Sequence, residues 1–213
     1  MNITYGTIEA GRALVIDHIT AQREKNPQFK VIDIGGVAGG GWSNPYVDLI
    51  VDINAQDSPR AMSIDITRPE AWTKLLDHVA QHGLFDYAIC NHTLEDVHNP
   101  FTTLELLPKI AQGGMLSMPS ANTELTRLDG DFLGYIHHRW IFDQDQGGIF
   151  VMPKLGYLES DLSVRRQLNP EIIEIRYQWQ GSLPFKIFMD NYLGPTTSHV
   201  RDQLNTCLGR SPR

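Results

Sequence analysis

Apolar and polar positions alternate along the first half of the chain between short buried runs and amphipathic stretches. The first amphipathic stretch carries an apolar stripe at helical spacing: Ile8, Gly11, Val15 and Ile19. Short apolar runs follow over 30–34 and 48–53, and we expect each of them to be a buried strand. Strands that alternate with helices are typical of βαβ units and a parallel sheet.

The next helix has the clearest start signal in the sequence. Thr67 and Glu70 have the spacing of a capping box, and Pro69 stands in the first turn, where its missing N–H does no harm. An apolar face then leads to Gly83, which is expected to end the helix. The pattern therefore predicts a capped helix between the second and third strands.

A third strand is predicted over 85–90, followed by a helix that opens at Asn99 and Pro100. Pro108 is expected to kink this helix, because its ring clashes with the preceding turn. A fourth strand over 115–118 then follows a pair of glycines.

Three further strands are predicted in the second half of the chain, over 148–153, 171–179 and 185–191. The 171–179 segment mixes apolar and polar positions, as an outer or antiparallel strand does. The sequence thus predicts an α/β fold with a doubly wound, mostly parallel seven-stranded sheet, helices on both faces and an antiparallel strand near the C-terminal end. One domain over 1–195 is expected, with a loose tail over 196–213.

Charge and cysteine content exclude several classes of partner and site. A net charge of −7 argues against a nucleic-acid partner, because phosphate binding needs clustered Lys and Arg. Cys90 and Cys207 lie far apart, so neither a disulfide framework nor a cysteine zinc site is expected. No apolar stretch is long enough to cross a bilayer, so we expect a cytoplasmic protein, monomeric or homodimeric, with no membrane partner.

The glycine-rich turn VIDIGGVAGGGW, over 31–42, is the most informative segment. A strand that ends in glycines lets backbone approach a ligand closely, although such turns also serve only to connect elements. Asp52 ends the second strand, close to where an acidic side chain accepts hydrogen bonds from ribose hydroxyls. Asp65 precedes the capped helix, either as an adenine contact or as a turn residue.

Four segments in this order resemble the class I S-adenosylmethionine-dependent methyltransferases, a Rossmann-like family. The segments are VIDIGGVAGG, DLIVDIN, FDYAICNHTLEDVHNP and LELLPKIAQGGMLSMPS, and the resemblance covers about 31–119. It implies S-adenosyl-L-methionine as cofactor, held by these residues: Asp33, Gly35, Gly36, Gly39, Asp52, Ile53, Asp65, Ile66, Asn91 and His92. The fourth-strand motif lacks the two prolines of nucleic-acid amino methylases, so the resemblance favours a small-molecule acceptor.

The chain departs from the family at Val37, which stands at the middle glycine of the GxGxG motif. A β-branched residue does not readily take a positive φ. An alternative to an active methyltransferase is therefore a methyltransferase-like domain that no longer catalyses and serves binding.

A second dense segment is GYIHHRWIF, over 134–142, and in similar methyltransferases this region forms part of the acceptor pocket. We expect 120–147 to be an acceptor-pocket insertion. A base, a cation and an aromatic wall are offered by His137, His138, Arg139 and Trp140. The candidate catalytic residues are His92, Glu95, His137, His138 and Arg139, with Asp96 as a further possible base.

Two other enzyme classes remain open. Four histidines, His92, His98, His137 and His138, would form the cluster of a metal-dependent enzyme, although none has an HExxH spacing, and no metal ligand is assigned. A dinucleotide oxidoreductase uses the same crevice of this fold.

Overall fold

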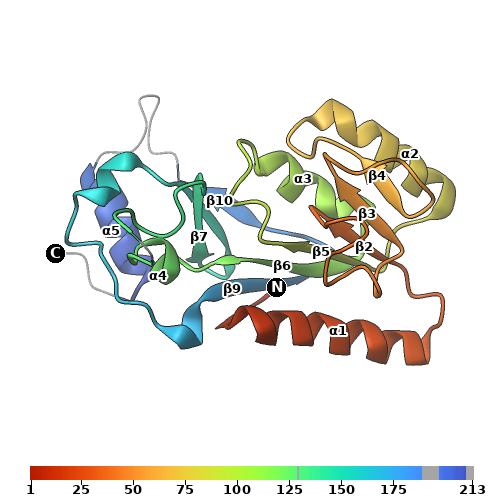
Figure 1. Cartoon of the computed structure of the whole chain (residues 1–213), viewed down its shortest axis with the longest axis horizontal. Helices are drawn as coiled ribbons and strands as arrows, with labels where there is room; N and C mark the ends of the chain where they lie inside the picture. The colour runs from red at the N-terminus through yellow and green to blue at the C-terminus, as the bar shows by residue number, and fades with distance from the viewer. Residues whose placement is uncertain (129, 189–196, 210–213) are drawn as a thin grey trace.

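A seven-stranded, mostly parallel sheet forms the centre of the protein, in the order β1-β9-β6-β5-β2-β3-β4 (Figure 1). The computed structural model describes residues 1–128, 130–188 and 197–209. The strands of this sheet are β1 (Asn2–Gly6), β2 (Val31–Ile34), β3 (Leu49–Asp52), β4 (Ala61–Ser63), β5 (Tyr87–Asn91), β6 (Gly113–Pro119) and β9 (Glu174–Gln180). Strands β4, β3, β2, β5 and β6 pair in parallel, whereas β9 runs antiparallel to both β6 and β1.

The two faces of the sheet pack against different helices because successive side chains of a strand point to opposite sides. Val31 and Ile50 pack in one cluster with Val15 and Ile19 of α1 (Ile8–Lys25). The neighbouring strand positions pack in another cluster with α2 (Thr73–His82) and α3 (Phe101–Ile110). Figure 1 shows α1 on one side of the sheet and the other two helices on the opposite side.

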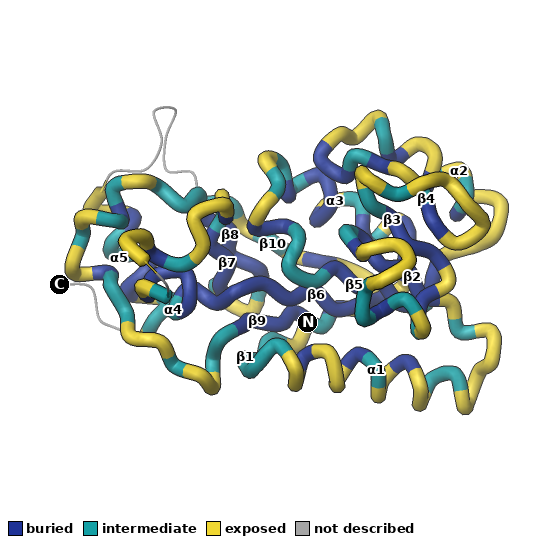
Figure 2. Tube along the Cα trace, in the orientation of Figure 1, coloured by how far each residue is buried: buried dark blue, intermediate teal, exposed yellow. Residues whose placement is uncertain are grey.

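A second layer extends the molecule beyond the far end of β6 and β9. Its three-stranded sheet has the order β10-β8-β7 and consists of β7 (Trp140–Asp145), β8 (Gly148–Pro153) and β10 (Phe185–Ile187). Helices α4 (Ala121–Glu124) and α5 (Thr197–Cys207) share a buried cluster with β8. Figure 2 shows the buried strands of this layer in dark blue. Short 3₁₀ turns complete the chain: Pro69–Trp72, Gly156–Glu159 and Pro170–Ile172.

The predicted mixed α/β fold with a mostly parallel seven-stranded sheet is confirmed. Two of the seven strands differ from those predicted. The large sheet contains β1 and β4, whereas the predicted strands over 148–153 and 185–187 belong to the small sheet. The expected antiparallel strand is confirmed at β9. Of the strand expected over 185–191, residues 189–191 lie outside the described residues.

Two local expectations are wrong. Thr67 does not cap a helix, because its hydroxyl donates instead to Asp65 Oδ1 at 2.6 Å, and the chain enters α2 through the 3₁₀ turn at Pro69. Part of the expected loose tail is the helix α5, whose Val200 and Leu204 are fully buried. This buried apolar pair fixes 197–207 to the second layer.

The single domain over 1–195 and the 120–147 insertion stay predictions, although the second layer draws on residues well beyond 147. Among the described residues, none of the helices has the length and apolar character needed to span a membrane.

Candidate functional site

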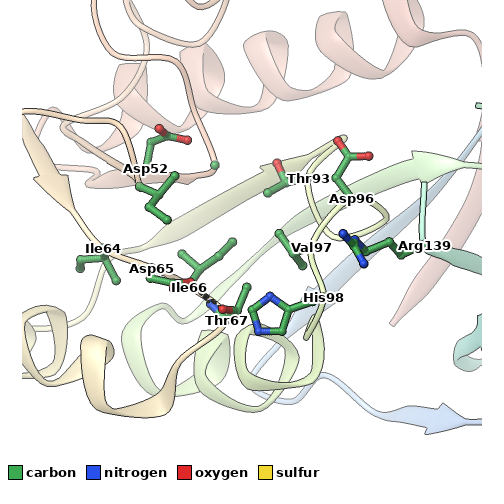
Figure 3. A pocket seen from close by; sticks show the side chains of 12 residues that line it. Asp52, Ile64, Asp65, Ile66, Thr67, Thr93, Asp96, Val97, His98 and Arg139 are labelled. Atoms are coloured by element: carbon green, nitrogen blue, oxygen red, sulfur yellow. Dashed lines mark hydrogen bonds between the residues drawn. The ribbon is translucent and has the colours of Figure 1, made fainter. Parts of the chain in front are cut away.

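A cavity of about 290 Å³ opens at the carboxyl ends of the parallel strands (Figure 3). It lies where the strand order reverses, since the chain runs outward from β2 to β4 and then returns to the other side of β2 as β5. In open α/β sheets this is the place where ligands bind. Its wall is formed by Gly35, Asp52, Ile53, residues 64–67, Thr93, residues 96–98 and Arg139.

The glycine turn meets the cavity at Gly35. This residue has φ 83°, donates its N–H to Val51 O at 2.7 Å, and leaves no room for a Cβ because Thr93 stands against it. Val37 is 65% exposed and is not among the described residues with a positive φ. The positive φ angles of the turn therefore belong to Gly35 and Gly39, and Val37 does not strain the turn.

Asp33 supports the turn from within the sheet and does not line the cavity. Its carboxylate is buried, accepts a short hydrogen bond from the Ser43 hydroxyl, and lies so close to Gly36 that a Cβ there would overlap it. Burial raises the pKa of Asp33 to about 6, against the opposing effect of the Ser43 hydrogen bond. Asp33 thus fixes the turn that carries Gly35.

Two carboxylates line one side of the cavity. Asp52 accepts the N–H of Asn54 on Oδ1 at 2.8 Å, and within the described part of the chain no donor bonds its Oδ2. Asp65 accepts both the hydroxyl and the N–H of Thr67, and the hydroxyl bond in particular lowers its pKa. Asp52 is therefore the better placed of the two to receive ligand hydroxyls, while Asp65 also serves the turn.

The opposite side of the cavity is made by two loops far apart in sequence. Arg139 N donates to Glu95 O at 2.6 Å, and the indole of Trp140 donates to Val97 O at 2.8 Å. These bonds dock the segment before β7 onto the loop that follows β5. Figure 3 shows the result, with Asp96 and Arg139 at one end of the cavity and Asp52 at the other.

His92 does not line the cavity and belongs to a buried charged network. Its Nε2 lies 3.0 Å from Glu174 Oε2 and its Nδ1 lies 3.4 Å from Glu95 Oε1. Burial alone would lower the pKa of His92, but the hydrogen bonds and charges of Glu174 and Glu95 raise it to about 9. A histidine that is protonated at neutral pH is an ion-pair partner and not a general base.

The network continues to the start of α1. Arg176 Nε lies 2.5 Å from Glu174 Oε1, and its guanidinium also donates to Thr7 O. Gly11 leaves the space that Glu174 occupies, since a Cβ there would overlap the carboxylate. Glu174 thus pairs with both His92 and Arg176, and Arg176 links the start of α1 to β9.

Three buried polar atoms beside this network have no hydrogen-bond partner among the described residues: Asn91 Oδ1, Glu95 Oε2 and Ser117 Oγ. Asn91 and Ser117 face each other across β5 and β6. Buried polar atoms of this kind are normally satisfied by ordered water or by a ligand.

The two adjacent histidines have different surroundings. His138 is buried with its Nδ1 2.5 Å from Glu124 Oε1, whereas His137 is exposed. His137 and Tyr135 line a second hollow of about 460 Å³, whose wall also includes Phe132 and Ile136. The predicted segment thus faces both the cavity, through Arg139, and this hollow.

The structure brings six of the predicted cofactor and catalytic residues to the cavity: Gly35, Asp52, Ile53, Asp65, Ile66 and Arg139. It places the others elsewhere: Asp33, Gly36, Gly39, Asn91, His92, Glu95, His137 and His138. Asp96, the further possible base, and His98 of the metal hypothesis also line the cavity. The histidines of the metal hypothesis are divided, since His137 and His138 group with Asp96 and not with His92 or His98. Four further cavity residues were not predicted: Ile64, Thr67, Thr93 and Val97. Ile64 and Thr93 come just after β4 and β5, which is a signal that could have marked them, whereas Thr67 and Val97 lie further along the same loops.

No protein-family model matches the chain, and no curated protein matches its sequence. Among solved structures, the chain is similar to the N-terminal domain of EvdMO1 with SAH bound, at 16% identity and a TM-score of 0.33, covering 76% of this chain and 64% of that one. The same domain in the presence of SAH and D-fucose gives 15% identity and a TM-score of 0.29, covering 76% and 66%. The chain therefore spans less than two thirds of those chains, and at these TM-scores the likeness carries no argument about function.

Proposed function

We propose that the protein is a class I, Rossmann-like methyltransferase that transfers a methyl group from S-adenosyl-L-methionine to a small-molecule acceptor. The observation that carries this proposal is the cavity at the strand-order reversal, lined by Gly35 from the glycine turn and by Asp52 at the end of β3. Both residues come from motifs that resemble this family.

The polar groups of the cavity suit a nucleoside with a charged tail. Asp52 Oδ2 would accept a ribose hydroxyl, and the backbone at Gly35 permits close approach. Asn91 Oδ1 lies outside the cavity wall at the end of β5 and has no hydrogen-bond partner among the described residues, so we expect the methionine part to extend beyond the wall toward it with its ammonium group. Methyl transfer from a sulfonium needs chiefly that the acceptor be aligned with the methyl group.

The second hollow is our proposed acceptor site. Phe132, Tyr135 and Ile136 give it an apolar wall, and His137 of the hollow is followed two residues later by Arg139 of the cavity wall. A largely apolar hollow with few polar groups is typical of small-molecule sites. The net charge of −7 also favours a small acceptor over a nucleic acid.

Calorimetric titration with S-adenosylmethionine and S-adenosylhomocysteine tests the cofactor. We expect stoichiometric binding that Asp52→Asn weakens by roughly 10-fold. The substitution exchanges a hydrogen bond to a charged group, which contributes about 1.5–3 kcal/mol, for a neutral one of about 0.5–1.5 kcal/mol, a loss of about 1–1.5 kcal/mol. Asp17→Asn, an equal charge change on the exposed face of α1, is the matched control and should bind as the wild type does. Absence of binding at millimolar ligand would refute the proposed cofactor.

The alternative function, a methyltransferase-like domain that does not catalyse, depends on Val37 disturbing the turn. Val37 is exposed and has no positive φ, so it gives no support to this alternative. Val37→Gly should therefore leave the affinity for S-adenosylhomocysteine within about 2-fold of the wild type. A large gain in affinity on this substitution would favour the alternative.

A further inference from the structure

Three side chains at the border of the cavity and the hollow point their donor atoms toward one another. His138 Nε2 lies 3.5 Å and His137 Nε2 lies 3.7 Å from Asp96 Oδ1, and one ligand atom from each residue lies within 4.8 Å of the other two. Asp96 lines the cavity and His137 lines the hollow. We propose that Asp96, His137 and His138 bind a divalent transition-metal ion of the zinc class.

The distances fit metal ligands better than they fit hydrogen bonds. Both separations exceed the usual hydrogen-bond range of about 2.7–3.2 Å. Zinc bonds of about 2.0–2.1 Å in a tetrahedron place neighbouring ligand atoms about 3.3–3.4 Å apart. The two measured separations are therefore close to the edges of such a coordination shell.

The surroundings of His138 match those of a metal-bound histidine. Its Nδ1 lies 2.5 Å from Glu124 Oε1, so the ring N–H is held by a buried carboxylate and Nε2 is left as the free donor. Metal-bound histidines almost always have their second nitrogen held in this way. Lys154 Nζ lies 2.7 Å from Glu124 Oε2. This ion pair neutralises the positive charge of the lysine next to the proposed cation site.

The fold brings the three donors together through elements remote in sequence. The hydrogen bonds of Arg139 and Trp140 to the loop after β5 place the two histidines beside Asp96. Gly134 has φ 55° and lies against Glu124, with no space for a Cβ, so the turn that carries the histidines packs directly on their supporting carboxylate.

Two imidazoles and one carboxylate leave further coordination positions for water or a ligand oxygen, as in catalytic zinc sites. Imidazole donors select transition metals over Mg²⁺ and Ca²⁺. None of the three donors is assigned to the proposed cofactor, so the metal site does not depend on it.

Metal binding is tested by calorimetry on protein purified without a histidine tag and stripped with EDTA, using Zn²⁺ and Mg²⁺ as separate probes and Co²⁺ absorption as a report of geometry. We expect one equivalent of Zn²⁺ and weak or no binding of Mg²⁺. Asp96→Asn and His137→Ala should each weaken Zn²⁺ binding by more than about 10-fold. Both side chains are substantially exposed, at 44% and 63%, so the variants should fold, which circular dichroism checks.

His82→Ala, which removes an exposed histidine of α2, is the matched control and should leave Zn²⁺ affinity unchanged. The proposal is overturned if the wild type binds no stoichiometric Zn²⁺, if the Asp96 and His137 variants bind as the wild type does, or if His98→Ala abolishes binding. Because no cofactor is added, failure of S-adenosylhomocysteine to bind would leave this result standing.

Discussion

The buried network around His92 makes a defined prediction about stability and pH. His92 is held between Glu95 and Glu174 and is protonated at neutral pH in the folded state. In the unfolded chain the same side chain titrates at its ordinary pKa of 6.5. Replacing it by Asn removes the titration and keeps a residue that tolerates the left-handed backbone, with φ 48°, at this position.

The sign and size follow from proton linkage. Between the unfolded pKa of 6.5 and the folded pKa of about 9, the folded state binds more protons, so stability falls as pH rises. The contribution is full below the unfolded pKa and is lost as pH passes through the folded one. At about 1.4 kcal/mol for each pH unit, the rise in pKa corresponds to about 3 kcal/mol.

Urea unfolding between about pH 6 and about pH 9.5 measures this term. The free energy of unfolding of the wild type should fall by about 3 kcal/mol more across this range than that of His92→Asn. Titration of Cys90 at the alkaline end affects both proteins and cancels in the difference. His82→Asn, at an exposed site, should keep the wild-type slope. Equal slopes for the wild type and His92→Asn would show that the network does not hold a charged imidazole.

Two further predictions concern stability. Gly35→Ala should lower the free energy of unfolding by about 2–4 kcal/mol, because it adds both a strained φ and an overlap with Thr93. Gly39 has a similar φ of 81° but open space around it, so Gly39→Ala should lower the free energy of unfolding by only about 1–2 kcal/mol. Urea unfolding measures both values, and equal losses of stability would show that the Thr93 side chain moves to make room for the added methyl group. Burial raises the pKa of Asp143 to about 6, so the folded state binds more protons between pH 3.8 and 6 and stability falls with rising pH there. Asp143→Asn, which keeps the acceptor for the Tyr5 hydroxyl, should therefore stabilise the protein by about 1–3 kcal/mol near pH 7.5 and by little below about pH 4; an unchanged stability near pH 7.5 would contradict burial as the cause.

Strands and helices with a strong local pattern were predictable from the sequence. Val31–Ile34 is apolar in all but one position and is buried on both faces, so its strand is evident without tertiary information. The edge strand Asn2–Gly6 was missed because its residues are mostly half-buried and polar, and its pairing with Glu174–Gln180 joins segments more than 160 residues apart. Local pattern carries no information about such a partner.

The same limit explains which site residues were predictable. Gly35 directly follows β2 and Asp52 is the last residue of β3, so the parallel sheet alone brings them to one edge. Arg139 reaches the cavity because its segment docks onto the loop after β5. This docking depends on tertiary contacts, so the sequence indicated Arg139 by its chemistry and by the resemblance but not by local pattern.

The motif NHTLEDVH shows why residue type alone did not separate structural from ligand-facing roles. His92 takes a left-handed φ, which turns the chain so that His92 and Glu95 direct their side chains into the buried network. Asp96 and His98 of the same loop line the cavity. All four side chains look equally suited to acid–base work in the sequence. Two features that residue type does not show separate their roles. One is the left-handed backbone at His92, and the other is the ion pair of His92 with Glu174, more than 70 residues away. Residues that could act on a ligand are therefore those that the network does not engage.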